Sequence, residues 1–436
     1  WGLLQAAMVA SERQLKRRSG EGCAETIAAR TAAVAEAEDG LRVGVAASAT
    51  HETSASVSDT FTARKASRID SDGSINSING REIAMLDTSD AEATETDHSS
   101  LSRDNHDEDT GCSSFELPFD VRYVVAPMVG ASDLAFRLLC RRHGATAAYT
   151  EMLFSSRIIK DPEYLRCKLQ TCEEDRPLIV QLCATTVDDL VAAGKLVCPK
   201  CDAIDINLGC PLPQAAEEGF GAWLLDREHW PMLRSMVREL KSATRIPVFC
   251  KIRLLSTVEE TVALCETLQA AGCALLAIHG RRRPPLGQHR LFRDTPADLD
   301  AIRQVVAAVS IPVLTNGNTQ HPSDVAANLS FTKAAGIMCA EGLLRDPRLF
   351  EVGHAPSKSA SASALLEYLH IASERSPHEI SQVRGHVMWM LGKHGSGRRC
   401  TWTHLGPFSA EQLRSAIVGA ESISELETIV RCTLAP

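Results

Sequence analysis

A cysteine stands in a glycine–cysteine–proline turn directly after a short apolar stretch of the sequence. Residues 205–211 read Asp-Ile-Asn-Leu-Gly-Cys-Pro, and the cysteine is Cys210. Gly209 and Pro211 fix the backbone on both sides of the thiol. Most free cysteines are small, inert core residues. A cysteine fixed at the end of a strand is instead placed for chemistry, as a nucleophile or as a proton donor.

The surroundings of Cys210 in the sequence favour the proton donor. Nothing in the sequence supplies a fixed histidine base, and the nearby acidic residues Glu217 and Glu218 disfavour a thiolate. The expected role is therefore a protonated thiol that gives up its proton. Gly219 and Gly221 follow, and we interpret their segment as a loop able to close over the cysteine as a lid.

Two cationic side chains follow another apolar stretch. Lys251 and Arg253 come after residues 248–250, and strand alternation sends both to one face with Ile252 opposite. One interpretation is a pair of surface cations whose charged ends reach water. The other is a pair that faces a phosphate or a reduced flavin, which is anionic near N1, because neighbouring buried cations are costly without an anion.

Polar residues end two further apolar stretches. Gln181 closes the stretch 178–181, and an amide there can pair with both a donor and an acceptor of a heterocycle. His279 is followed by Gly280, which permits close backbone approach, and by three arginines at 281–283. Arginine suits two-pronged contact with phosphate. The pattern predicts positive charge at the rim of a ligand site.

Each of these residues stands at the carboxyl end of a predicted strand, in a pattern in which strands alternate with helices. Helical patterns, such as 257–271 and 295–309, lie between the apolar stretches. Eight strands alternating with helices over about 230 residues are typical of a TIM (β/α)8 barrel, whose active site is built at the carboxyl ends of the strands. An open, doubly wound sheet would carry a phosphate fingerprint after its first strand, and the sequence has none there. The predicted strands are 123–126, 145–150, 178–182, 203–207, 247–251, 275–279, 312–315 and 336–339.

The first and the last two of these strands end in residues that suit a flavin nucleotide. The first ends in Pro127, Met128 and Val129, which form either a rest for a flat isoalloxazine ring or a turn with a core methionine. The last two are followed by Asn-Gly-Asn at 316–318 and Ala-Glu-Gly at 340–342. Barrels usually bind phosphate in those two loops, and glycines let the backbone approach it. FMN fits a site of this size.

Charge and composition divide the 436 residues into three parts. Residues 1–118 hold 11 Lys and Arg against 21 Asp and Glu, a net charge of −10, whereas the remaining residues carry +1. Residues 1–118 also have few aromatic residues and are expected to be disordered. We assign the barrel to residues 119–352. Residues 353–436 are expected to form a small helical domain. Its predicted helices are 364–374, 378–391 and 410–430.

The fifteen cysteines are scattered rather than arranged as a disulfide framework, which predicts reduced thiols in an intracellular protein. Cys198 and Cys201 form a CxxC pair, but they flank a predicted buried strand, so we expect no metal site. No apolar run approaches the roughly 18 residues of a membrane-spanning helix. We expect a monomer without membrane contact in the cytoplasm or nucleus, and an organellar location stays open.

Taken together, these residues resemble the tRNA-dihydrouridine synthase family. The resemblance covers residues 121–390 in the family's order. Residues 175–181, 183–184 and 340–342 resemble the eukaryotic subgroup that acts on D-loop positions 16 and 17. The matching motifs lie at 126–129, 149–152, 205–211 with Gly219 and Gly221, 251–253, 279–281, 316–318, and 340–342 with Pro347 and Phe350 beyond.

The resemblance implies an FMN-binding TIM barrel, a helical domain that contacts tRNA, and NADPH or NADH as reductant. It implies reduction of the uridine C5=C6 bond to dihydrouridine, with hydride going to C6 and a proton from Cys210 to C5. The base must leave the stack, because C5=C6 is otherwise out of reach. The implied substrate contacts come from Asn207, Arg253 and Arg281. The implied cofactor contacts come from Pro127, Met128, Val129, Gln181, Lys251, His279, Asn316, Gly317, Asn318, Ala340, Glu341 and Gly342.

Two other functions stay open on the sequence. One is an FMN-dependent barrel oxidoreductase that acts on a small molecule and needs no RNA. The other is a tRNA-binding protein without catalysis, against which the complete set of motif residues argues. The chain departs from the family's pattern at 217–218, where basic residues are usual, at Arg282 and at 284–287. We expect these departures to alter the choice of tRNA position rather than catalysis.

Overall fold

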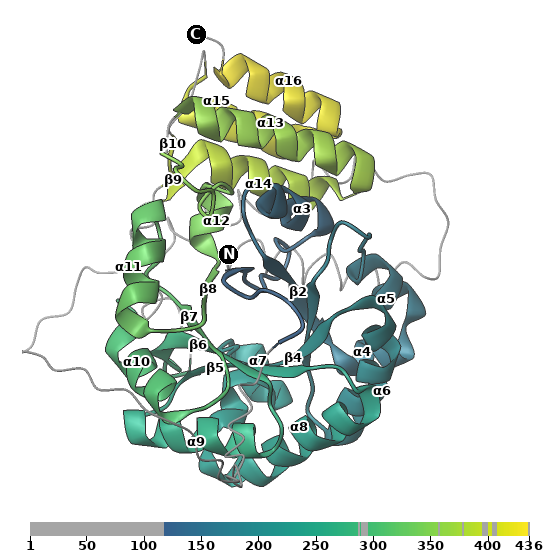
Figure 1. The fold of residues 1–436 in the computed structure, drawn as a ribbon. Coiled ribbons are helices and arrows are strands. Elements are labelled where there is room, and N and C mark those ends of the chain that lie inside the picture. Colours follow the sequence, from purple (N-terminus) through teal and green to yellow (C-terminus); the bar gives the residue numbers. More distant parts are fainter. Residues whose placement is uncertain are drawn as a thin grey trace, which may run out of the picture. The chain divides into compact units, whose positions relative to one another are not determined.

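The computed structural model describes residues 117–286, 288, 295–355, 358–376, 379–394, 400–402 and 408–434. All but the last two residues of the predicted disordered extension lie outside this part of the chain. Eight parallel strands close into a barrel, in which each strand pairs with the next and β8 pairs with β1 (Figure 1). The predicted TIM barrel is confirmed. Its strands are β1 (Tyr123–Val125), β2 (Ala147–Phe154), β3 (Leu178–Cys183), β4 (Ala203–Leu208), β5 (Val248–Leu254), β6 (Leu275–Arg282), β7 (Val313–Asn316) and β8 (Gly336–Cys339).

Helices lie around the outside of the barrel (Figure 1). The predicted helix 257–271 is α9, which Thr257 caps by accepting from the Glu260 N–H. The predicted helix 295–309 begins only at Leu299, because the Asp298 carboxylate caps α10. No helix in the described ranges is long and apolar enough to cross a membrane. The barrel helices are α3 (Leu134–Arg142), α4 (Ser155–Lys160), α5 (Pro162–Lys168), α6 (Val187–Val197), α7 (Pro213–Glu218), α8 (Trp230–Thr244), α9 (Val258–Ala270), α10 (Leu299–Ala308), α11 (Pro322–Thr332) and α12 (Glu341–Arg345).

The barrel interior changes from apolar to polar along the strands. Ile179, Phe249, Ala277 and Leu314 belong to an apolar cluster in the interior. Side chains of a strand alternate between its two faces, so the residue two positions further along each of these strands also points inward. Those residues are polar, and they define one end of the barrel as the candidate site. The inward polar residues are Gln181, Asp205, Asn207, Lys251, Arg253, His279 and Asn316.

Among the described residues, four helices and a two-stranded ribbon follow the barrel. The predicted single helix 410–430 is wrong, because the chain turns between α15 and α16. Ser422 Oγ accepts from the Glu425 N–H, and the Glu425 carboxylate accepts from the Glu421 N–H, which starts a new helix. The antiparallel ribbon was not predicted. These elements are α13 (Lys358–Arg375), α14 (Ile380–Leu391), β9 (Gly392–His394), β10 (Cys400–Trp402), α15 (Ala410–Gly419) and α16 (Ile423–Leu434).

The C-terminal helices pack on the first barrel helix, with α13 against α3 (Figure 1). His386 of α14 is fully buried, and its Nε2 lies 2.7 Å from Asp133 Oδ2. The His386 ring stacks on Phe136, with centroids 4.5 Å apart. Asp133 also caps α3 by accepting from the Phe136 N–H at 3.0 Å. One carboxylate therefore fixes the start of α3 and binds the C-terminal helices.

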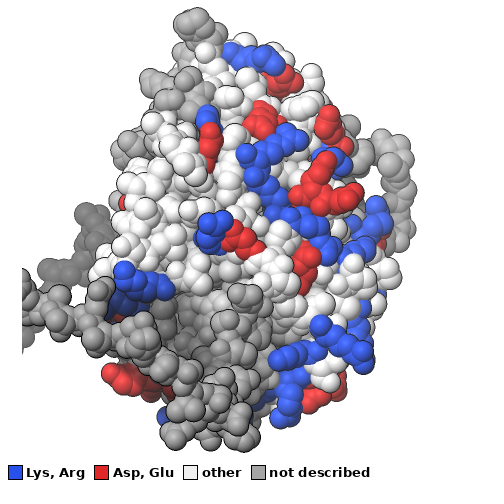
Figure 2. All heavy atoms as spheres, viewed as in Figure 1, with Lys and Arg blue, Asp and Glu red and all other residues white. Residues whose placement is uncertain are grey.

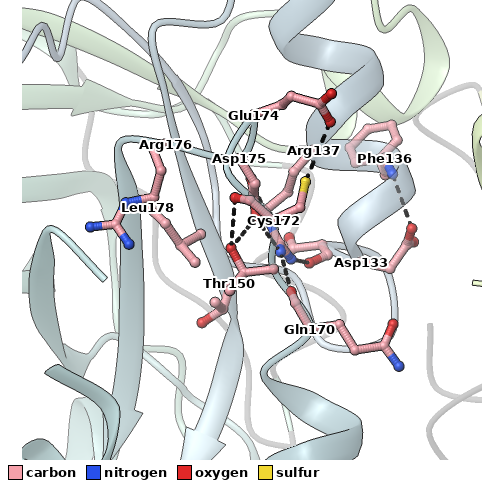
Figure 3. A network of polar contacts seen from close by, with 12 residues as sticks. Asp133, Phe136, Arg137, Thr150, Gln170, Cys172, Glu174, Asp175, Arg176 and Leu178 are labelled. Atoms are coloured by element: carbon pink, nitrogen blue, oxygen red, sulfur yellow. Dashed lines mark hydrogen bonds and ion pairs between the residues drawn. The ribbon is translucent and has the colours of Figure 1, made fainter. Parts of the chain in front are cut away.

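A buried ion-pair network places the segment that leads into β3 (Figure 3). Arg137 of α3 donates to Asp175, with 2.6 Å between Nη2 and Oδ2, and to the backbone oxygen of Gln170 at 2.8 Å. Arg141 Nε reaches the same carboxylate at 3.2 Å. Asp175 is fully buried, so losing either arginine would leave its charge poorly compensated. The network holds the start of β3, the strand that carries Gln181.

Gly336 of β8 has no room for a side chain. A Cβ there would lie 1.9 Å from the backbone oxygen of Val121 and 2.8 Å from Leu314 Cδ2. We expect Gly336→Ala to lower the free energy of unfolding by about 3 kcal/mol, the cost of overpacking a rigid site. A Cβ on Gly419 would meet no other residue within 4 Å, so Gly419→Ala should change the free energy of unfolding by less than about 0.5 kcal/mol. Urea unfolding of both variants checks this, and equal midpoints would contradict it.

Candidate active site

The carboxyl ends of neighbouring strands bring five predicted polar residues side by side. Asn207 lies in register with Lys251, and Arg253 lies in register with His279. His279 in turn lies in register with Asn316. All five share the inward face of β4 to β7, so their side chains meet at the barrel mouth.

A chain of hydrogen bonds connects a buried carboxylate with the turn that holds Cys210. Gln181 Nε2 donates to Asp205 Oδ2 at 2.8 Å, and Asn207 Nδ2 donates to Gln181 Oε1 at 2.7 Å. Asn207 Oδ1 accepts from the N–H groups of Gly209 and Cys210, at 3.1 and 3.0 Å. Asp205 thereby sets the orientation of both amides, and Asn207 holds the cysteine turn.

Asp205 is a site residue that sequence reasoning missed. It is fully buried, and burial raises the pKa of its carboxyl to about 7, against the opposing effects of Gln181 and Lys251. A signal for it exists in the sequence. Asp205 is an acidic residue within an apolar strand, two positions before Asn207, and it therefore points inward with it.

Cys210 carries a protonated thiol at neutral pH. Burial raises the pKa of this thiol, and the charge of Arg253 only partly opposes the shift. The expected role of the acidic neighbours is not confirmed. Glu217 and Glu218 are exposed, and Glu218 accepts a hydrogen bond from Gln214 at 2.8 Å. Burial, rather than these acids, keeps the proton on Cys210.

The segment after Cys210 lies closed on the cysteine. The backbone N–H of Ala222 donates to the Cys210 oxygen at 3.0 Å. Gly219 and Gly221 adopt φ values of +75° and +68°, which favour glycine. A Cβ on Gly221 would lie 2.9 Å from the Cys210 Cβ, so close packing also requires glycine there. The predicted lid segment is packed against the site in this structure.

Lys251 and Arg253 are held by neutral groups. Lys251 Nζ donates to Asn316 Oδ1 at 3.0 Å, and Arg253 Nε donates to the Gly209 oxygen at 2.7 Å. Within the described residues, neither cation forms an ion pair with a carboxylate. Burial is the main cause that lowers the pKa of Lys251 to about 8 and of Arg253 to about 10. A bound anion would stabilise both charged forms.

His279 is neutral. Burial, followed by the charges of Arg253, Lys251 and Arg281, lowers its pKa well below the usual value. Arg281 Nη1 lies 2.8 Å from His279 Nε2. A guanidinium only donates, so Nε2 is the acceptor and the ring proton sits on Nδ1. Arg281 also donates to the Thr295 oxygen at 2.5 Å. Within the described residues no hydrogen bond forms at His279 Nδ1, so its N–H can donate to a ligand.

The loops after β7 and β8 lie against each other. Gly317 has φ +122°, and a Cβ on it would lie 2.7 Å from the Cβ of Ala297. The Asn318 amide bonds both the N–H and the oxygen of Ala297, each at 2.8 Å. A Cβ on Gly342 would lie 2.6 Å from the Thr319 oxygen. These glycines are needed for packing between loops, a role the sequence did not reveal.

The residues after β1 and β8 divide between core and surface. Met128 is 3% exposed and belongs to the apolar cluster formed with α3 and the C-terminal helices. This placement matches the core-methionine alternative for its side chain. Pro127 and Val129 are partly exposed, and Val129 packs near Cys210. The predicted pair Ala340 and Glu341 opens α12. In the described part of the chain, no three His, Cys, Asp or Glu side chains lie together as a metal site would require.

Sequence comparison assigns this barrel to a family. Residues 124–402 match the family described as dihydrouridine synthase (Dus), and the chain belongs to that family. A tRNA-dihydrouridine(16/17) synthase NAD(P)(+)-like protein of Mus musculus is 42% identical over 268 residues, which cover 61% of this chain and 54% of the relative. The Rattus norvegicus protein of the same description is 41% identical over 268 residues, covering 61% of this chain and 59% of the relative.

More distant relatives carry two kinds of description. A tRNA-dihydrouridine(16/17) synthase of Schizosaccharomyces pombe is 32% identical over 278 residues, covering 62% of this chain and 68% of the relative. A Saccharomyces cerevisiae protein described as a tRNA-dihydrouridine(20a/20b) synthase is 36% identical over 232 residues, covering 52% of this chain and 61% of the relative. The chain spans little more than half the length of its mouse and rat relatives.

Proposed function

We propose that this protein reduces the C5=C6 bond of uridine to dihydrouridine at positions 16 and 17 of the tRNA D-loop. The observation that carries the proposal is the geometry of the barrel mouth, where Asn207 and Arg253 hold the turn of Cys210, a partly buried thiol whose pKa is raised by burial. A target uridine has to be extruded into this mouth, because a stacked base does not expose C5 and C6. The relatives described as 16/17 synthases support the choice of position.

The mouth fits FMN. Removal from water disfavours the charged forms of Lys251 and Arg253. An anionic ligand would stabilise both charges. The polar edge of the flavin ring can be bound by Lys251, Gln181 and the Nδ1–H of His279. The loops after β7 and β8 can bind the phosphate. When bound, FMN supplies the hydride that uracil C6 accepts, and NADPH or NADH replenishes it.

The chain's own residues complete the reduction. The Cys210 S–H bond breaks, its proton goes to uracil C5, and the electron pair stays on sulfur as a thiolate. Arg253 stabilises that thiolate, because its charge already favours the anionic form of Cys210. Asn207 orients the turn by accepting from the Cys210 N–H. Protonation at C5 balances the hydride gained at C6.

The partner in this proposal is tRNA, and the protein binds it as a monomer. The proposal includes no metal and no membrane contact. The proposed location is the cytoplasm or the nucleus, with an organelle as the alternative. Basic and acidic side chains are interspersed on the face drawn in Figure 2. That face is not a uniformly basic surface of the kind that attracts the phosphate backbone. We assign RNA contact to the helical region 353–436 and to the site itself.

Mass spectrometry of tRNA tests the proposal. Unmodified tRNA is incubated with the protein, FMN and NADPH, and we expect one D-loop uridine to gain the mass of two hydrogen atoms. If no uridine gains this mass, the proposal is wrong. Reduction of a free pyrimidine without RNA would favour the small-molecule oxidoreductase instead. Binding of tRNA without product would favour the non-catalytic binding protein.

Substitutions at two glycines of the cysteine loop can distinguish the effect of steric contact with Cys210 from the effect of backbone strain. Gly219 and Gly221 both have positive φ, but a Cβ meets Cys210 only at Gly221 and meets nothing within 4 Å at Gly219. We expect Gly221→Ala to lower kcat at least about tenfold, since small displacements of a reacting group are costly. Gly219→Ala should lower kcat less. Steady-state rates on tRNA decide, and equal rates for the two variants would refute the steric role.

A further inference from the structure

Arg283 contacts one short segment of the chain, residues 222–226. It follows β6 directly, and its Nη1 donates to the Ala222 oxygen at 2.9 Å. Both terminal nitrogens donate to the Asp226 carboxylate at 3.0 Å. Its Cζ lies over the Trp223 ring, 4.4 Å from the centroid. Four contacts thus run from one side chain to residues 222–226.

The segment 222–226 in turn supports the cysteine turn. The same Ala222 whose oxygen binds Arg283 donates its N–H to the Cys210 oxygen at 3.0 Å. Gly221 packs against Cys210 so closely that a Cβ would meet its backbone oxygen at 2.8 Å. A displacement of Ala222 would therefore move Cys210. Arg253 holds the opposite side of the turn through Gly209 at 2.7 Å.

Trp223 packs against the apolar cluster that contains Cys183 and Phe220. Its indole N–H is buried and has no hydrogen-bond partner among the described residues. The guanidinium over its ring therefore supplies a directional contact that the indole N–H lacks. The Arg283 side chain is 26% exposed and that of Asp226 is 53% exposed, so the ion pair itself is largely open to water and the contacts with Ala222 and Trp223 are needed to fix the arginine.

The three consecutive arginines have different tasks. Arg281 contacts His279, and Arg282 Nε donates to the Leu255 oxygen at 2.9 Å. Arg283 contacts the cysteine loop, where it binds Asp226, a residue 57 positions earlier in the sequence. The expectation that this run gathers charge for a phosphate does not describe Arg283, whose guanidinium already faces the Asp226 carboxylate.

We propose that Arg283 is a positioning residue, which clamps residues 222–226 and thereby holds Cys210 where its proton can be donated. The proposal rests on the proposed function for its catalytic consequence. Arg283 acts through Ala222, whose oxygen accepts from Arg283 and whose N–H donates to the Cys210 oxygen. A lysine in its place keeps the charge but loses the two-pronged pairing and the flat stacking surface.

The test compares Arg283→Ala, Arg283→Lys and Asp226→Asn with the wild type. The matched control is Arg303→Ala, because Arg303 also pairs with an aspartate, Asp300, and lies 5.7 Å from an aromatic centroid, that of Phe331. We expect Arg283→Ala to lower kcat by about 10- to 100-fold with KM nearly unchanged, as a misplaced reacting group does. Arg283→Lys and Asp226→Asn should fall between it and the wild type.

A second readout needs neither RNA nor flavin. Alkylation of Cys210 by iodoacetamide, followed by peptide mass spectrometry, should be several-fold faster in Arg283→Ala, because a loosened turn exposes the thiol. Cys167, which is exposed, should react at an unchanged rate, and the buried Cys265 should stay protected. Arg303→Ala should match the wild type in both readouts.

Two results would overturn the clamp. One is an Arg283→Ala protein with wild-type kcat and wild-type Cys210 labelling. The other is a loss of kcat accompanied by labelling of Cys265, which would indicate general loosening of the fold. Should Arg283→Ala not fold, Asp226→Asn and Arg283→Lys decide in the same way. A wild type that reduces no uridine would refute the proposed function, while Cys210 labelling would still decide the clamp.

Discussion

Replacing Cys210 by alanine is expected to slow dihydrouridine formation by about 10²- to 10⁴-fold, the range that general acids contribute. The reason is the burial that keeps this thiol protonated and the hydrogen bonds that hold its turn. Without the thiol, water has to protonate C5 in a closed mouth. The measurement is the initial rate of mass gain on tRNA, compared at equal flavin content.

Cys183 supplies the matched control for this substitution. It ends β3, is buried, and belongs to the apolar cluster against which Cys210 packs. Cys183→Ala removes a neighbouring thiol without touching the proposed proton donor, so its rate should stay within about threefold of the wild type. Reduction of the flavin by NADPH should be unchanged in both variants. Wild-type turnover by Cys210→Ala would rule out the proton-donor role.

Lys251→Met is expected to weaken FMN binding by about 10- to 100-fold, which corresponds to the loss of one hydrogen bond to a charged group. Lys251 reaches the mouth from β5 and is held there by Asn316 at 3.0 Å. Methionine has a similar length, so the loss reflects the charge and the hydrogen bond. Fluorescence quenching of FMN on titration with the protein measures the change, and Lys160→Met, at the exposed end of α4, is the control.

The same lysine predicts how FMN binding depends on pH. Burial lowers the pKa of Lys251 to about 8, so the free site loses its charge as the pH rises through that value. An anion favours the ammonium form and raises this pKa, so binding takes up a proton between the two values. Wild-type affinity should therefore fall above pH 8, and Lys251→Met should lose this dependence. Equal pH profiles for both proteins would contradict the assignment.

The sequence predicted most of the barrel and the inward residues of the site, because both follow from strand periodicity. Gln181, Lys251 and His279 each stand two positions after an apolar interior residue of the same strand. Side chains alternate along a strand, so this spacing turns all three inward, near the carboxyl ends of their strands. Periodicity also explains why Asp205 could have been found. Asp205 can bind Gln181 because the two residues lie in register on neighbouring strands and both point inward. The order of the strands and the alternation of side chains imply this contact.

Other features depend on contacts between distant loops and were not predictable from local pattern. Arg283 meets Asp226 only because two βα loops fold over the same edge of the barrel. The break between α15 and α16 is different, since Ser422 and Glu425 form the serine–glutamate spacing that starts helices. That signal was present in the sequence and was outweighed by the apolar periodicity on both sides of it.

The joint between α3 and the C-terminal helices limits how this protein can vary. Asp133, Phe136 and His386 belong to both parts at once, and one apolar cluster extends from β1 through α3 to α16. A chain that ended after the barrel would leave that surface of α3 open to water and prone to aggregation. The outward faces of the C-terminal helices can therefore vary in evolution, while their inward faces stay under the constraints of the barrel's own core.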